Sequence, residues 1–109
     1  MNYIHKQGDT FEAVNFQLFR NTQPIDLTGA IIKMQIRKEC GSIPIISFTS
    51  VANAGITITA PLSGMFKINK QIINIAEYNY LYDIEITFSD GTVKTWIEGE
   101  FLINCDITR

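Results

Sequence analysis

The chain has 109 residues, a length that suits a single domain, residues 1–109, with its own hydrophobic core. Hydrophobic residues make up 46% of it and charged residues 18%, a balance that excludes an intrinsically disordered protein. The 9 basic and 11 acidic residues give a net charge of −2, and the basic residues are scattered along the chain, so we expect no nucleic-acid partner.

The sequence shows no sign of a membrane span or of a secretory signal. The apolar runs are far shorter than the roughly 20 residues of a spanning helix, and the first residues lack the apolar run of a signal peptide. We therefore expect no membrane partner and synthesis in the cytoplasm without export. In that compartment Cys40 and Cys105 are expected to be free structural thiols, with a disulfide as the alternative.

Apolar and polar residues alternate along much of the chain, as in strands that bury one face and expose the other. In chain order, the predicted strands include residues 14–18, 32–37, 56–59, 65–68, 80–88, 92–98 and 101–108. Turn residues separate them. The Ser89-Asp90-Gly91 sequence predicts a hairpin between residues 80–88 and 92–98, and Gly99 is expected to separate residues 92–98 from the last strand.

Two further segments need interpretation. Asp26-Leu27-Thr28-Gly29 is read as a turn rather than part of a calcium loop, because the spacing of further acidic ligands is missing. Residues 70–77 place Ile72, Ile73 and Ala76 at helical spacing, which predicts a short helix. The β-branched isoleucines make a strand the alternative.

These elements predict an all-β fold: an antiparallel β-sandwich, immunoglobulin-like, with about eight strands and at most one short helix. A closed barrel is less suitable because long and short strands are mixed. The expected core consists of the inward-facing apolar residues Val14, Phe16, Leu18, Ile32, Met34, Ile36, Tyr82, Ile84, Ile86, Phe101 and Ile103.

The sequence offers no recognisable active site. His5 is the only histidine and lies near no partner, so we expect a surface residue on an edge strand. Asp83 and Glu85 share one strand face and could act as an acid–base pair or hold a cation. The preferred interpretation is that this face is exposed to solvent and that Lys94, on the next strand, balances its negative charge. We therefore expect no catalytic, cofactor-binding or metal-binding residues, and no enzyme.

Three apolar residues are candidates for an interface. Trp96 is in phase with Lys94 and Glu98, which predicts an outward-facing ring, and Phe19 and Leu81 are out of phase with the apolar sets of their strands. Because tryptophan is enriched at interface hot spots, we expect Trp96, Phe19 and Leu81 to contact a partner. A platform for carbohydrate is the alternative use of the Trp96 ring.

Short signatures recur in order along most of the chain. They are residues 8–10 (GDT), 26–30 (DLTGA), Arg37, 63–64 (SG), 80–85 (YLYDIE), 89–91 (SDG), 99–101 (GEF) and 107–109 (ITR). In combination they resemble a family of small structural proteins of tailed bacteriophages. The resemblance is to the N-terminal domain of upper baseplate proteins and to short stand-alone proteins of phage particles.

The resemblance implies a non-enzymatic β-sandwich in the virion, made in the host cytoplasm. It would act as an assembly or adaptor module of the tail, baseplate or neck, binding other virion proteins and forming a homo-oligomer. Family members with a baseplate role continue into a distal, receptor-oriented region. This sequence stops at Arg109, so a direct host-binding role is not expected. The alternative function is a stand-alone carbohydrate-binding β-sandwich module.

Overall fold

The computed structural model describes residues 2–105, and its regular structure is all-β apart from two 3-10 turns. The predicted continuation of the last strand over residues 106–108 lies outside the described residues, as does the signature at residues 107–109. The strands are β1 (Tyr3–Lys6), β2 (Thr10–Phe11), β3 (Val14–Gln17), β4 (Phe19–Arg20), β5 (Gln23–Pro24), β6 (Ile31–Arg37), β7 (Ile46–Thr49), β8 (Ile56–Ala60), β9 (Met65–Ile68), β10 (Gln71–Ile72), β11 (Tyr78–Thr87) and β12 (Val93–Asn104). The 3-10 turns are η1 (Val51–Asn53) and η2 (Pro61–Ser63).

The largest sheet has five strands in the order β1-β12-β11-β6-β7. Its pairs are antiparallel, except that β1 runs parallel to β12. The predicted hairpin joins β11 to β12, where Phe88 donates its amide hydrogen to the Thr92 carbonyl at 2.8 Å and Gly91 has φ +90°. The length of β11 follows from the regular alternation of apolar and polar residues before the turn.

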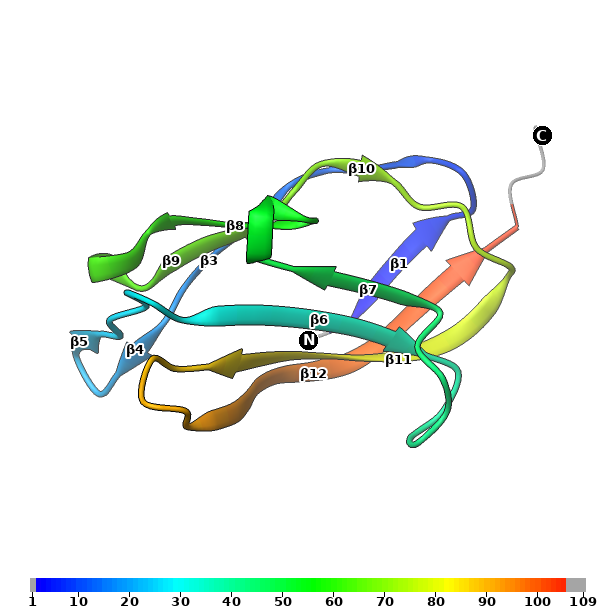
Figure 1. The fold of residues 1–109 in the computed structure, drawn as a ribbon. Helices are drawn as coiled ribbons and strands as arrows, with labels where there is room; N and C mark the ends of the chain where they lie inside the picture. Colours follow the sequence, from blue (N-terminus) through cyan, green and yellow to red (C-terminus); the bar gives the residue numbers. More distant parts are fainter. Residues whose placement is uncertain (1, 106–109) are drawn as a thin grey trace.

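Smaller sheets lie on one side of the five-stranded sheet (Figure 1). One contains β3, β9 and β8 in that order, and two-stranded ribbons pair β10 with β2 and β4 with β5. The strand count therefore exceeds the eight expected, because β2, β4, β5 and β10 are pieces of only two residues. Turns between them keep these pieces short. The turn between β4 and β5, for example, contains Asn21 with φ +57°.

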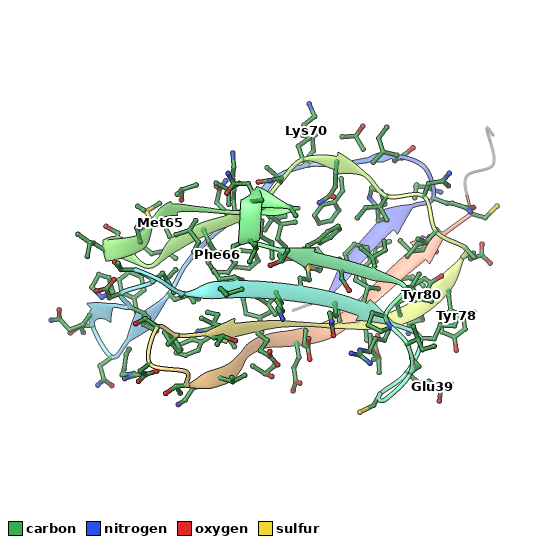
Figure 2. The ribbon with its side chains drawn as sticks, viewed as in Figure 1. Glu39, Met65, Phe66, Lys70, Tyr78 and Tyr80 are labelled. Atoms are coloured by element: carbon green, nitrogen blue, oxygen red, sulfur yellow. The ribbon has the colours of Figure 1, made fainter. Side chains whose placement is uncertain are left out.

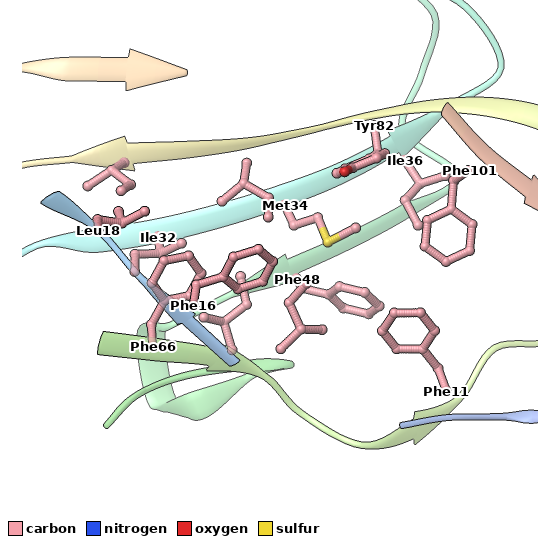
Figure 3. Packing of buried hydrophobic residues seen from close by; sticks show 14 of the residues in the cluster. Phe11, Phe16, Leu18, Ile32, Met34, Ile36, Phe48, Phe66, Tyr82 and Phe101 are labelled. Atoms are coloured by element: carbon pink, nitrogen blue, oxygen red, sulfur yellow. The ribbon is translucent and has the colours of Figure 1, made fainter. Parts of the chain in front are cut away.

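The hydrophobic core fills the space between the large sheet and the smaller ones (Figure 3). Ten of the eleven residues predicted for it are buried, and Val14 is half-buried against them. Adjacent residues of a strand point to opposite faces of the sheet. In β9, Phe66 is therefore buried in the core whereas Met65 points outward (Figure 2). The core also contains residues that were not among the eleven predicted for it, namely Phe11, Ile25, Leu27, Ala30, Phe48, Ile56, Phe66, Ile68, Ile73 and Tyr80.

The predicted helix over residues 70–77 is wrong, because this segment contains the strand β10 paired antiparallel with β2. Ile73 donates its amide hydrogen to the Asp9 carbonyl and accepts a hydrogen bond from the Gly8 amide at 2.9 Å. Ile73 is buried while its neighbour Ile72 is exposed. The β-branched side chains thus favour the extended conformation, with one side of it facing the core.

Strand β12 differs from expectation at two places. It continues through Gly99, which was expected to interrupt it, and Gly99 lies directly opposite the large side chain of Tyr82. A β-bulge occurs further back, where Ile84 pairs with Ile97 but the next residue, Glu85, pairs with Thr95. Trp96 is the additional residue at this bulge, so the alternation of the strand changes phase there.

Candidate functional site

The outer face of the large sheet, opposite to the core, carries a hollow of about 740 Å³. Strands β6, β11 and β12 form its floor, and the loop after β6, which contains Glu39 (Figure 2), forms part of its rim. We call this surface the acidic hollow. Its lining residues are Lys33, Gln35, Arg37, Glu39, Cys40, Gly41, Leu81, Tyr82, Asp83, Glu85, Glu98, Gly99 and Glu100.

The acidic hollow concentrates the negative charge of the protein. Its lining contains five carboxylates and two cations, a net charge of −3, whereas the whole sequence carries −2. The rest of the sequence therefore sums to +1. The carboxylates come from adjacent strands, because Asp83 and Glu85 project outward from β11 and Glu98 and Glu100 from β12.

Cross-strand register determines which charges face each other in the acidic hollow. Asp83 lies directly opposite Glu98, and like charges in that position destabilise a sheet. Glu85 lies opposite Lys33 of β6 rather than near the expected Lys94, which the bulge has moved into register with Ile86. Lys33 is thus the cation in register with the Asp83–Glu85 strand face.

The second cation of the hollow, Arg37, is held by its own loop. Its guanidinium donates hydrogen bonds to the Ser42 carbonyl and, at 2.6 Å, to Oε1 of Gln35. The first contact ties the rim loop to β6, and the second holds the guanidinium beside Gln35 on the floor of the hollow.

Leu81 provides an apolar contact within this charged surface. Its side chain is 40% exposed, and it lies between Glu100 of β12 and Arg37 of β6 in the register of the sheet. The exposure expected from the sequence is thus confirmed for this candidate. Its role as an interface residue stays a prediction.

The expected outward position of Trp96 is wrong. The ring is half-buried and packs against the hydrophobic core, as does the adjacent Ile97. The bulge explains the error, since the inserted residue breaks the alternation that placed Trp96 in phase with Lys94 and Glu98. A bulge of this kind is not visible in the spacing of the residues, and no signal in the sequence marks it.

Phe19, the third candidate, is 48% exposed and lies far along the chain from the other two, in the ribbon where β4 pairs with β5 opposite Pro24. Near this ribbon, a second hollow of about 700 Å³ lies between Arg20, the turn at Asp26 and the turn at Asp90. Side-chain and backbone hydrogen bonds from Thr28 lower the pKa of Asp26, and backbone and side-chain hydrogen bonds from Thr92 lower the pKa of Asp90. These carboxylates therefore stabilise their own turns, as was predicted for residues 26–29.

The aromatic residues on the core side of the large sheet form a packed cluster. Tyr82 is 3% exposed, and its ring lies 5.4 Å from that of Tyr3 and 6.1 Å from that of Phe101 between centroids. Burial, with a smaller effect of Tyr3, raises the pKa of Tyr82 to about 12. The Tyr80 hydroxyl donates a hydrogen bond to the Ala76 carbonyl at 2.6 Å. Both phenols are thus structural.

The remaining reactive side chains do not gather into one place. His5 lies on the edge strand β1, as expected, with its Nε2 2.9 Å from the Asp9 carbonyl and its ring against Phe11. Cys40 and Cys105 are exposed and not bonded to each other. Across residues 2–105, no three His, Cys, Asp or Glu side chains are grouped so that they could hold a metal ion. Within the same residues, no helix has the length and apolar character needed to cross a membrane.

The sequence indicated only part of the acidic hollow. Asp83, Glu85 and Leu81 were singled out individually, but Glu98 and Glu100 were not recognised as their neighbours. The hairpin signal at residues 89–91 was sufficient to pair β11 with β12, and a count of paired positions from that turn would have come close to placing the carboxylates together. Comparison with protein-family models, with curated protein sequences and with solved structures gives no match to this chain.

Proposed function

We propose that this chain is a non-enzymatic structural protein of a tailed-bacteriophage particle, an assembly module of the tail, baseplate or neck. In this proposal the acidic hollow binds a positively charged surface of another virion protein. The observation that carries the binding role is the charge distribution, −3 in the hollow against −2 for the whole sequence. The placement in a virion rests on the sequence resemblance described above.

The physical chemistry of the acidic hollow favours a basic partner. A cationic surface that covers Asp83 and Glu98 would relieve the repulsion between these two opposed carboxylates. Leu81, which is exposed at the end of the hollow next to Arg37, would add an apolar contact to the interface. Binding of this kind is expected to weaken at high ionic strength, because salt screens exposed charges.

We further propose that the fold is an immunoglobulin-like β-sandwich. In a variable-type immunoglobulin domain one sheet contains strands G, F, C and C′, and the other contains B, E and D. The order β12-β11-β6-β7 in the large sheet matches strands G, F, C and C′. The order β3-β9-β8 in the three-stranded sheet matches strands B, E and D. Such a scaffold presents the outer face of β6, β11 and β12 as a rigid surface, which suits an assembly module.

The alternative function, carbohydrate binding, has less support from the geometry. It required the ring of Trp96 to be available as a flat platform on the outer face. That ring packs partly against the core instead. The acidic hollow is a better surface for a cationic protein than for a neutral sugar.

The proposal is tested by the incorporation of variants into phage particles. Glu100→Lys reverses one exposed charge in the hollow, and Glu12→Lys reverses one exposed charge outside it. We expect Glu100→Lys to lower the amount of protein per particle by about ten-fold, the effect of losing a well-placed charge interaction. Glu12→Lys is expected to leave it unchanged, and both variants should keep the wild-type melting temperature. Equal incorporation of the two variants would contradict the role of the acidic hollow.

A further inference from the structure

The turn between β11 and β12 contains the single Asp-Gly sequence of the chain, and Asn-Gly does not occur in it. An Asp side chain can be attacked at its carboxyl carbon by the backbone nitrogen of the next residue. Glycine favours this ring closure because it has no side chain to hinder it. The turn lies at one end of the large sheet, where Asp90 and Gly91 are both exposed (Figure 1).

The reaction is an isomerisation that uses no reactant other than water. A bond forms between the Gly91 nitrogen and Cγ of Asp90, the bond from Cγ to the carboxyl hydroxyl breaks, and the amide proton leaves with that hydroxyl as water. Water then opens the succinimide ring. Attack at the Cγ carbonyl restores Asp90, whereas attack at the backbone carbonyl leaves isoaspartate, in which the chain continues through the former side chain.

Both reacting groups are held by hydrogen bonds in the closed turn. The Gly91 amide, which contains the attacking nitrogen, donates to the Phe88 carbonyl at 2.9 Å. Oδ1 of Asp90 accepts a hydrogen bond from the Thr92 amide at 2.9 Å. Backbone and side-chain hydrogen bonds from Thr92 also lower the pKa of Asp90, and the ionised carboxyl lacks the hydroxyl that must leave.

Hydrogen bonds rather than crowding protect this turn, as a comparison with Asp26 shows. A Cβ at Gly91 would meet no described heavy atom within 4 Å, so its surroundings leave room for the ring. Asp26 has the same kind of hydrogen bond, because its Oδ1 accepts from the Thr28 amide at 2.9 Å. The residue after Asp26 is the fully buried Leu27, whose side chain hinders ring closure. Asp26 is therefore an internal reference that keeps the hydrogen bond and lacks the glycine.

We propose that Asp90–Gly91 is the site at which this chain forms isoaspartate, and that the closed β11–β12 turn suppresses the reaction until the turn opens. Opening releases the Gly91 nitrogen and the Asp90 carboxyl together, because the same turn holds both. The observed rate is then the rate in the open turn multiplied by the population of the open turn. The product cannot close the turn again in the same way, because its backbone is one atom longer. This inference is independent of the proposed function.

The experiment follows isoaspartate in the purified chain, folded in buffer and unfolded in guanidinium chloride. Trypsin releases residues 71–94, which contain Asp90, and residues 21–33, which contain Asp26. Chromatography with electron-transfer fragmentation locates the isomer. We expect it at Asp90 in the unfolded chain and about ten-fold more slowly in the folded chain, the effect of an open turn populated at a tenth or less. Equal rates would overturn the suppression, and faster conversion at Asp26 or Asp83 would overturn the site.

Two valines of equal exposure test whether opening of the turn limits the reaction. Val93 pairs with Thr87 at the end of the hairpin, whereas Val51 lies in η1, and both are 54% exposed. Glycine weakens strand pairing, so Val93→Gly should speed the conversion at Asp90 about three-fold or more. Val51→Gly should leave the rate unchanged, and thermal melts check that both variants are folded. Equal rates in the two variants would count against the opening step.

Asp90→Asn separates the effect of the closed turn from that of the ionised carboxyl. The Asn side chain keeps an oxygen that can accept the Thr92 hydrogen bond, and it closes the same ring with the loss of ammonia, so no carboxyl needs to be protonated. The product is recognised by its mass. The folded variant should react about ten-fold more slowly than the unfolded one, as in the wild type. Equal rates for the folded and unfolded variant would show that ionisation protects Asp90 and would overturn the role of the turn.

Discussion

Replacement of Gly64 by alanine tests how the turn between β8 and β9 is fixed to the rest of the molecule. Gly64 has φ +68° and ψ +27°, a left-handed conformation that costs a residue with a Cβ about 1 kcal/mol. A Cβ there would lie 2.6 Å from the Leu18 carbonyl oxygen and 2.9 Å from that of Ile25. Because these are backbone atoms, the turn must shift, which would weaken the 2.9 Å hydrogen bond from the Leu18 amide to the Gly64 carbonyl. Together these effects should lower the free energy of unfolding by about 3–5 kcal/mol.

Gly41→Ala is the matched control for this substitution. Gly41 also has a left-handed backbone, with φ +84°, but a Cβ there would meet no described heavy atom within 4 Å. Its cost should therefore be the conformational part alone, about 1 kcal/mol. Urea denaturation followed by circular dichroism measures both variants. Equal losses for Gly64→Ala and Gly41→Ala would refute the close contact between the β8–β9 turn and the chain at Leu18 and Ile25.

Three further predictions concern the core and its aromatic cluster. Ile84→Ala removes a fully buried side chain and should cost about 2–5 kcal/mol in urea denaturation; a loss within error would mean that the inner face of β11 is wrongly assigned. Trp96→Ala should lower the melting temperature, because the ring packs against the core, and unchanged stability would return Trp96 to the outer face. The pKa of Tyr82 is raised from 10.0 to about 12, so the neutral phenol stabilises the fold fully below pH 10, and this stabilisation should disappear as the pH rises from 10 to 12. The Tyr82→Phe variant should lack that part of the pH dependence of the unfolding free energy, and identical profiles for variant and wild type would contradict it.

The alternating segments of the sequence were sufficient to predict the long strands and most of the core. In β6 and β11 every second side chain points inward, because one face of the sheet is buried. The alternation of the sequence therefore identifies the buried residues of both strands. Core residues outside the strands, such as Leu27 and Ile73, have no such period around them. Their burial depends on tertiary contacts that a local pattern does not contain.

The position of Trp96 and the acidic hollow show the limits of local patterns in the candidate site. A single inserted residue at the bulge moved Lys94 away from Glu85 and turned Trp96 towards the core. The like-charge pair of Asp83 and Glu98 can be recognised only when the register between β11 and β12 is known. Charge and exposure of individual residues could be predicted from the sequence, whereas their grouping on one face required the pairing.

The presence of the protein in purified phage particles tests the proposed function most directly. Particles produced from the genome that encodes this chain would be purified and analysed by quantitative mass spectrometry, with immunogold labelling to locate the protein. We predict a fixed number of copies per particle, relative to the other tail proteins, and labelling at the tail, baseplate or neck. A protein found only in the soluble fraction of the infected cells, and absent from intact particles, would contradict its role as a structural protein of the virion.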